Sequence, residues 1–253
     1  MSSMMPHNKS KPNPYKGALT PISASNGIVS AKENAKRLLE DAEVFFGKER
    51  YPSACALACL AIEEMSKPAI IRKILLASSS EELCRGWKLF TSHHNKAAPW
   101  IVPHLIAKNP ETYEHFVETF MRQRDPVLLD SIKQISIYSG CYGNCHWSNP
   151  CDVIEKDVAN GVFSSARILA FSGQASRLDS EDGLKLWQAH MQGCYSVGYV
   201  TANNKIVEFF HEAARIGLLT KQEIPANVAF DFMTTVLILS DGEALEQIRG
   251  LEN

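Results

Sequence analysis

The sequence predicts an all-α protein, and three observations support this fold class. Apolar residues recur every three or four positions over long stretches such as 184–217, a spacing that gathers them on one face of a helix. Helix start and stop signals bracket the stretches: Ser30 and Glu33 have the spacing of a capping box, and Gly217 suits a helix C-terminus. No stretch of useful length alternates apolar and polar residues as a half-buried strand does.

The first 27 residues are rich in Ser, Pro, Asn and Lys and contain few bulky apolar side chains. Such a composition cannot offset the entropy of ordering, so we expect a mobile tail over 1–27. Order is expected to begin at Ser30, with a helix that ends near Gly47. A short link then leads to a second helix at 51–77, so the two helices are expected to be antiparallel neighbours.

The helix expected at 51–77 is the centre of the chain, because its first half is apolar on every side. Glu63, Glu64 and Lys67 interrupt this apolar run. A buried carboxylate needs a partner, and Lys67 stands four residues after Glu63 and three after Glu64. Taken alone, the cluster is most simply a structural ion pair where a core helix emerges into solvent. Pro68 is expected to kink the helix directly after the cluster.

Further helices are expected beyond a Ser-rich break at 78–80. One carries Trp87 and Phe90, and the others cover 110–137 (bent or split by Pro126), 152–172, 184–217 and the stretch after Pro225. The stretch 138–152 is rich in Gly, Asn and Pro and is expected to be a loop. The residues expected to be buried include Leu128, Ile132, Ile135, Val153, Val158, Val162, Phe163, Ala166, Leu169, Trp187, Met191, Cys194, Tyr195, Ile206, Phe209, Phe210 and Ala213.

Polar residues at 176–182 mark the clearest internal boundary. We therefore expect a helical bundle over 28–176 and an additional C-terminal helical region over 177–253.

The bulk composition is that of an ordinary globular protein, with 45% hydrophobic and 21% charged residues. A net charge of -2 gives no global basic field that would draw the chain to nucleic acid, although a local basic patch stays open. No apolar run approaches the roughly 20 residues of a membrane span, and the N-terminus lacks the layout of a secretory signal. Seven scattered cysteines are typical of reduced thiols. These features predict a cytoplasmic protein without a membrane partner.

Three groups of residues have side chains suited to chemistry, in the absence of any phosphate-binding loop or common catalytic motif. The first is Glu63, Glu64 and Lys67, and the second is His93, His94 and Lys96, imidazoles beside an ammonium that can hold a phosphate. Taken alone, the second group is more simply explained as a solvated helix end. The third group is Cys141, Cys145, His146 and Cys151. Its spacing matches no common zinc module, so free thiols are favoured, and the sequence implies no metal and no cofactor.

Four short motifs appear in order between residues 31 and 172. They are IEEMSK around Glu63 and Glu64, SHHNK at Ser92–Lys96, Lys133 followed by the Ile137–Tyr138 pair, and Trp147-Ser148-Asn149-Pro150. In these motifs the chain resembles the AbiV family of bacterial abortive-infection proteins.

The resemblance implies a HEPN-like, up-and-down helical bundle in a cytoplasmic prokaryotic protein, often homodimeric, that halts host or phage gene expression. Glu63, Glu64 and Lys67 match the family's EExxK motif, and His93 and Lys96 match its SHxxK motif. Tyr138 belongs to the IY turn, and Glu63, Lys67 and Tyr138 are the candidate binding residues. Two departures are present: Ser139 stands where the family often has Asp, and the Arg–His signature of catalytic HEPN proteins is absent.

The residues and the resemblance together lead to three functional hypotheses. The chain acts as a binding module for RNA, the translation apparatus or a partner such as a phage protein. Alternatively, it is a metal-independent RNase in which His93 is the acid or base, Lys96 stabilises the phosphate, and Glu64 with Lys67 orients them. Thirdly, the C-terminal helices form an effector region that the bundle controls. The missing Arg–His signature and the slightly negative charge favour binding.

Overall fold

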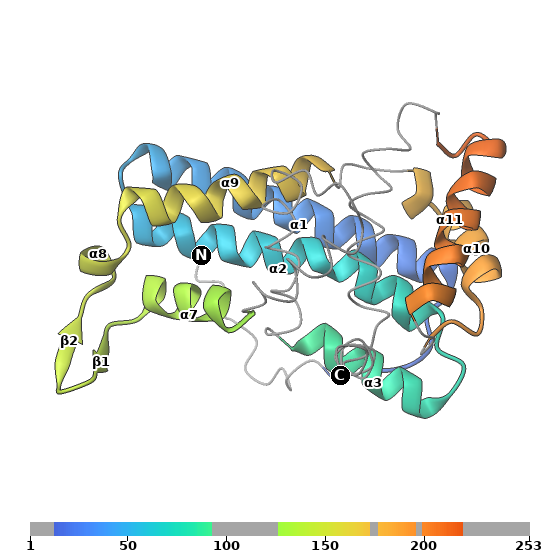
Figure 1. Ribbon diagram of the computed structural model, residues 1–253, viewed down its shortest axis with the longest axis horizontal. Helices are drawn as coiled ribbons and strands as arrows, with labels where there is room; N and C mark the ends of the chain where they lie inside the picture. Colours follow the sequence, from blue (N-terminus) through green and yellow to red (C-terminus); the bar gives the residue numbers. More distant parts are fainter. Residues whose placement is uncertain (1–12, 93–125, 173–176, 196–198, 220–253) are drawn as a thin grey trace, which may run out of the picture.

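The computed structural model describes residues 13–92, 126–172, 177–195 and 199–219 (Figure 1). Within these ranges the chain is almost entirely helical, with one small β-hairpin, which confirms the all-α prediction. The elements are α1 (Pro21–Gly47), α2 (Tyr51–Leu75), α3 (Ser80–Thr91), α7 (Pro126–Ile137), β1 (Gly140–Tyr142), β2 (His146–Ser148), α8 (Pro150–Val153), α9 (Lys156–Ser172), the 3₁₀ turn η2 (Arg177–Asp179), α10 (Glu181–Met191) and α11 (Tyr199–Arg215). No helix in the described ranges is long and apolar enough to span a lipid bilayer.

Helix α2 is the central element, as its all-round apolar character predicts. It packs against α1 along its length and also contacts α3, α7 and α9 (Figure 1). Small residues in its first half, Ala54, Ala58 and Ala61, are buried and allow the neighbouring helices to approach closely. The helix continues without interruption through Pro68, which lacks the N–H that would bond to the carbonyl of Glu64.

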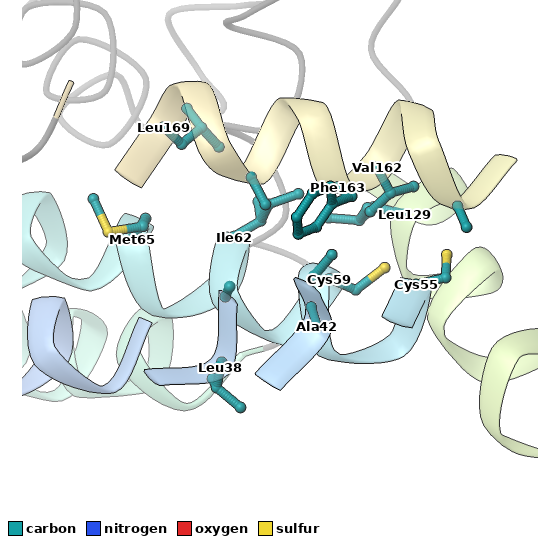
Figure 2. Packing of buried hydrophobic residues seen from close by; sticks show 14 of the residues in the cluster. Leu38, Ala42, Cys55, Cys59, Ile62, Met65, Leu129, Val162, Phe163 and Leu169 are labelled. Carbon is teal, nitrogen blue, oxygen red and sulfur yellow. The ribbon is translucent and has the colours of Figure 1, made fainter. Parts of the chain in front are cut away.

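One hydrophobic core lies between α1, α2, α7 and α9. Figure 2 shows side chains of α2 and α9 directed toward one another, with Phe163 of α9 beside Ile62 and Cys59 of α2. The ring of Phe163 also stacks on Phe46, with centroids 5.6 Å apart. Burying a side chain of this size contributes about 1.5–3 kcal/mol. This core therefore fixes how α9 and α7 lie on the α1–α2 pair.

A second core lies at the other end of the same two long helices, where the start of α1 and the end of α2 meet η2, α10 and α11. Trp187 of α10 packs edge-on against Phe209 of α11, with centroids 5.1 Å apart. The side chains predicted to be buried in this region, from Trp187 to Ala213, are buried. The described part of the C-terminal region thus packs directly on the bundle, while the division at residue 176 stays a prediction.

The start of the first helix was predicted too late. α1 begins at Pro21 rather than at Ser30, with Thr20 and Ser23 forming the capping box. Ala24 and Ile28 are buried in the second core, so residues 21–27 are not part of a tail. The reason is that this turn packs through small residues, which give little hydrophobic signal.

The stretch predicted to be a loop after α7 holds more structure than expected. Strands β1 and β2 pair in an antiparallel hairpin, and α8 begins at Pro150, with Ile154 and Glu155 separating it from α9. Strands of three residues are too short to show alternation in a sequence. Leu128, Val153 and Val158 were expected to be buried and are instead exposed. Leu129 occupies the core in place of Leu128.

Candidate functional site

Glu63 of α2 is buried and forms an ion pair with Lys133 of α7. The Lys133 ammonium lies 2.5 Å from the Glu63 carboxylate and 2.7 Å from that of Asp130, one turn earlier on α7. Burial acts to lower the pKa of Lys133, but the bonds to Asp130 and Glu63 outweigh it, and the pKa is raised. Lys133 therefore stays protonated inside the bundle. The ion pair thus links the EExxK motif on α2 to Lys133 of α7, which stands four residues before the Ile137–Tyr138 pair.

Glu64, the second acid of EExxK, binds a different lysine. Its carboxylate lies 2.5 Å from the ammonium of Lys67, and both side chains keep a small exposed fraction, 17% and 18%. The Lys67 ammonium also lies 5.2 Å from the centre of the Phe90 ring of α3. The three-residue spacing of Glu64 and Lys67 thus predicted an ion pair that the structure contains. Glu63 forms its ion pair with Lys133 of α7 instead of with Lys67.

The helix does not emerge into solvent after this cluster, as the sequence suggested. Residues 68–75 are all buried, including Arg72 and Lys73. The ion pair of Glu64 and Lys67 is confirmed. The expectation that the helix emerges into solvent after it was wrong, because α3 and the C-terminal elements cover this half of α2.

His93 and Lys96, the predicted catalytic residues of the SHxxK motif, lie outside the described residues, as does His94. The first described range stops at Ser92, two residues after Phe90. Because Phe90 contacts Lys67, α3 delivers the start of the motif to the neighbourhood of the Glu64–Lys67 pair. The association of His93 and Lys96 with that pair stays a prediction.

The side of α2 that faces α7 also carries two thiols one and two turns before Glu63. Cys55 and Cys59 are fully buried in the first core. The contact with Cys55, together with burial, raises the pKa of Cys59 well above its ordinary value. Cys59 is therefore a buried packing residue of the first core, close to the ion pair.

A second buried polar cluster was not predicted from the sequence. Asp179 of η2 lies 2.5 Å from the guanidinium of Arg72 on α2 and also pairs with Lys32 of α1. Burial acts to raise the pKa of Asp179, but Arg72 and Lys32 outweigh it and lower the pKa. Asp179 falls in the polar stretch that was taken for a boundary. The signal that could have found the cluster is a pair of cations, Arg72 and Lys73, inside an apolar helix.

Tyr138, the predicted binding residue, directly follows the end of α7 and is 61% exposed. Trp147 of β2 is 72% exposed, so the IY turn and the W-S-x-P element present two aromatic side chains to solvent. Cys141, Cys145 and Cys151 are free and exposed. In the part of the chain that the structure describes, no three His, Cys, Asp or Glu side chains converge on a metal-sized site.

A family model for AbiV proteins, of the HEPN type, matches residues 23–170. The chain belongs to the AbiV family. The match runs from the first turn of α1 into the last turn of α9 and contains both ion pairs of the EExxK motif. Elements η2, α10 and α11 of this AbiV protein lie beyond it. No curated protein matches the chain, and no solved structure does.

Proposed function

We propose that this AbiV protein is a bacterial abortive-infection protein that acts in the cytoplasm on host or phage gene expression. It does so by binding RNA, the translation apparatus or a partner protein. Membership of the family supports the defence role, and the chemistry of the buried cluster supports binding over catalysis.

The observation that carries the binding role is the burial of the Glu63–Lys133 pair. A catalytic acid or a phosphate-binding ammonium must reach its substrate, and these two side chains are enclosed by α2 and α7. Their charges are satisfied by each other and by Asp130. The pair therefore serves to fix α7 on α2, which is the use that buried charge pairs allow when both partners are satisfied.

Fixing α7 also fixes the segment directly after it. Tyr138 lies five residues after Lys133, and the hairpin with Trp147 comes next along the chain. Both aromatic side chains are exposed. Aromatic residues with an apolar body and a polar tip are common anchors of binding surfaces. We therefore place the binding surface on Tyr138 and Trp147, with the buried ion pair as its support.

The alternative is a metal-independent endoribonuclease, and one observation favours it. The Glu64–Lys67 pair is partly exposed and lies beside the end of α3, from which the SHxxK motif continues. In this mechanism His93 moves the proton of a 2′-hydroxyl, Lys96 stabilises the charge on the phosphate, and Glu64 with Lys67 orients them.

The experiment that separates the two functions is expression of the intact chain and of His93→Ala in bacteria challenged with a panel of phages. Growth, amino-acid incorporation into protein, and integrity of total RNA are measured together. His211→Ala is the matched control, because His211 is an exposed histidine on α11. Binding predicts protection with intact RNA in all three strains. Fragmented RNA that His93→Ala alone abolishes would establish the ribonuclease instead, and absence of protection by the wild-type chain would contradict the defence role.

A further inference from the structure

The β-hairpin after α7 lies at one end of the molecule, away from the bundle (Figure 1). Its register pairs Cys141 with Trp147 and Tyr142 with His146, which leaves Gly143, Asn144 and Cys145 as the connecting turn. Gly143 and Cys145 both have positive φ, 52° and 67°. The last residue of a three-residue hairpin turn ordinarily adopts this left-handed conformation and is preferably glycine.

Cys145 occupies that position at a cost, because the left-handed conformation disfavours residues with a Cβ. The conformation brings the Cys145 sulfur to 3.8 Å from the sulfur of Cys141, whose thiol donates a hydrogen bond to it. Both residues are exposed. Two accessible thiols thus lie close together at the tip of the hairpin. One of them, Cys145, has a backbone conformation that glycine would adopt more easily.

We propose that Cys141 and Cys145 form a reversible disulfide site that reacts with peroxide. A disulfide bond is about 2.05 Å long, so the two sulfur atoms need to approach by a further ~2 Å, which side-chain rotation in an exposed turn supplies. The site does not depend on the proposed function, because it rests on the thiol geometry alone.

The reaction consists of two steps that together remove two electrons from the pair of sulfurs. The Cys145 thiolate attacks one oxygen of hydrogen peroxide and the O–O bond breaks, which gives a sulfenic acid and, after protonation of the leaving hydroxide, one water. The Cys141 sulfur then loses its proton and attacks the Cys145 sulfur, the S–O bond breaks, and the second water leaves. A small dithiol reverses the reaction by thiol–disulfide exchange.

The order of the two thiols is set by their hydrogen bond. The thiol of Cys141 donates its hydrogen to the sulfur of Cys145. Partial desolvation and this hydrogen bond raise the pKa of Cys141, which keeps its proton until the second step. Cys145 is therefore the residue oxidised first, and Cys141 is the resolving thiol.

Oxidation would close a covalent ring at the tip of the hairpin, next to Trp147, the residue that pairs with Cys141 across the two strands. Among the described residues, Trp147 has the most exposed large apolar side chain. The disulfide would thus restrict the element that presents Trp147 to solvent.

The test uses the full-length reduced protein, treated with hydrogen peroxide and then with an alkylating reagent. Chymotrypsin cleaves after Tyr142 and Trp147, so Cys141, Cys145 and Cys151 are released on three different fragments. Mass spectrometry should find the Cys141 and Cys145 fragments linked and separable by dithiothreitol, while Cys151 and the exposed Cys84 are alkylated. The Cys141–Cys145 linkage should exceed any disulfide that involves Cys84 by at least ~10-fold, because the thiol that resolves the sulfenic acid is held nearby.

Single variants test the order of events. Cys141→Ser should accumulate a sulfenic acid on Cys145 that dimedone traps, and Cys145→Ser should form no linkage. Cys151→Ser and Cys84→Ser are matched controls, and both should form the Cys141–Cys145 linkage as the wild type does. Far-UV circular dichroism checks that each variant keeps its helices.

Several results would overturn the proposal. Linkage of Cys145 to Cys151, linkage between two chains, or equal oxidation of all exposed thiols would show that the 3.8 Å geometry does not direct the reaction. A zinc ion bound stoichiometrically by the untreated protein and lost in Cys145→Ser would show that the thiols hold a metal instead.

Discussion

The ammonium of Lys133 on α7 lies 2.5 Å from the carboxylate of Glu63 on α2, and both side chains are buried. The two residues are 70 positions apart and belong to two different motifs of the sequence. Their pairing makes the EExxK motif and the IY turn parts of one structural unit. The first acid of EExxK holds α7 in place, and the second acid pairs with Lys67 near the end of α3.

Removal of one partner of this pair should be strongly destabilising. Glu63→Leu or Lys133→Met leaves a buried charge with less compensation, which costs about 3–5 kcal/mol, measured as a fall in the free energy of unfolding in urea. The double variant Glu63→Leu/Lys133→Met removes both charges and should lose much less than the two single losses together. Glu40→Leu and Lys36→Met, in an exposed ion pair on α1, are the control and should change the free energy of unfolding little. Additive losses in the double variant would contradict a direct interaction.

Stability in acid should depend on Asp179. Because Arg72 and Lys32 lower its pKa in the folded state, Asp179 contributes stability above its unfolded pKa of about 3.9, and that contribution is lost as pH falls through the lower, folded value. Asp179→Asn should therefore be less stable than the wild type at neutral pH, by about 3–5 kcal/mol. The difference should shrink below about pH 4.

Urea unfolding of both proteins over a series of pH values measures this effect. Asp182→Asn is the matched control, since Asp182 is exposed at the start of α10. A difference between Asp179→Asn and the wild type that is constant with pH would show that the Asp179 carboxylate is not held ionised by its partners.

The buried face of α9 can be tested with one pair of variants. Phe163→Ala removes a ring from the first core and should lower the free energy of unfolding by about 3–5 kcal/mol. Val158→Ala, on the exposed face of the same helix, should change it by less than about 0.5 kcal/mol. Equal losses in urea unfolding would mean that the faces of α9 are assigned wrongly.

Helix α2 shows most clearly what the sequence could predict and what it could not. Its burial on all sides was predictable, because residues 54–62 are apolar around the whole helix. The partner of Glu63 was not predictable, because helix spacing reports only neighbours three or four positions away, and Lys133 is brought in by the packing of α7. Asp179 escaped notice for the same reason: its partner Arg72 is 107 positions away. The motifs identified the family, but which side chains meet was decided by tertiary packing.

Self-association stays a prediction of the sequence. The resemblance to HEPN-like bundles implies a two-fold dimer whose equivalent polar clusters, with Lys67, His93 and Lys96, face one groove, and a single copy has few cations with which to hold a nucleic-acid backbone. Sedimentation of the intact chain at micromolar concentration should therefore show a dimer. A monomer would remove the shared-groove ribonuclease and leave the binding function.

The most direct test of the central claim is the efficiency of plating of phages on cells that express four forms of the chain, the wild type and three variants. The claim is that Glu63 and Lys133 support the fold while Tyr138 contributes to the binding surface. The charge-free variant Glu63→Leu/Lys133→Met should keep the protection given by the wild type, provided that it accumulates to the same level. Tyr138→Ala should lose it, and Val207→Ala, an exposed apolar residue on α11, should keep it. Loss of protection in the folded charge-free variant, with full protection by Tyr138→Ala, would contradict the claim.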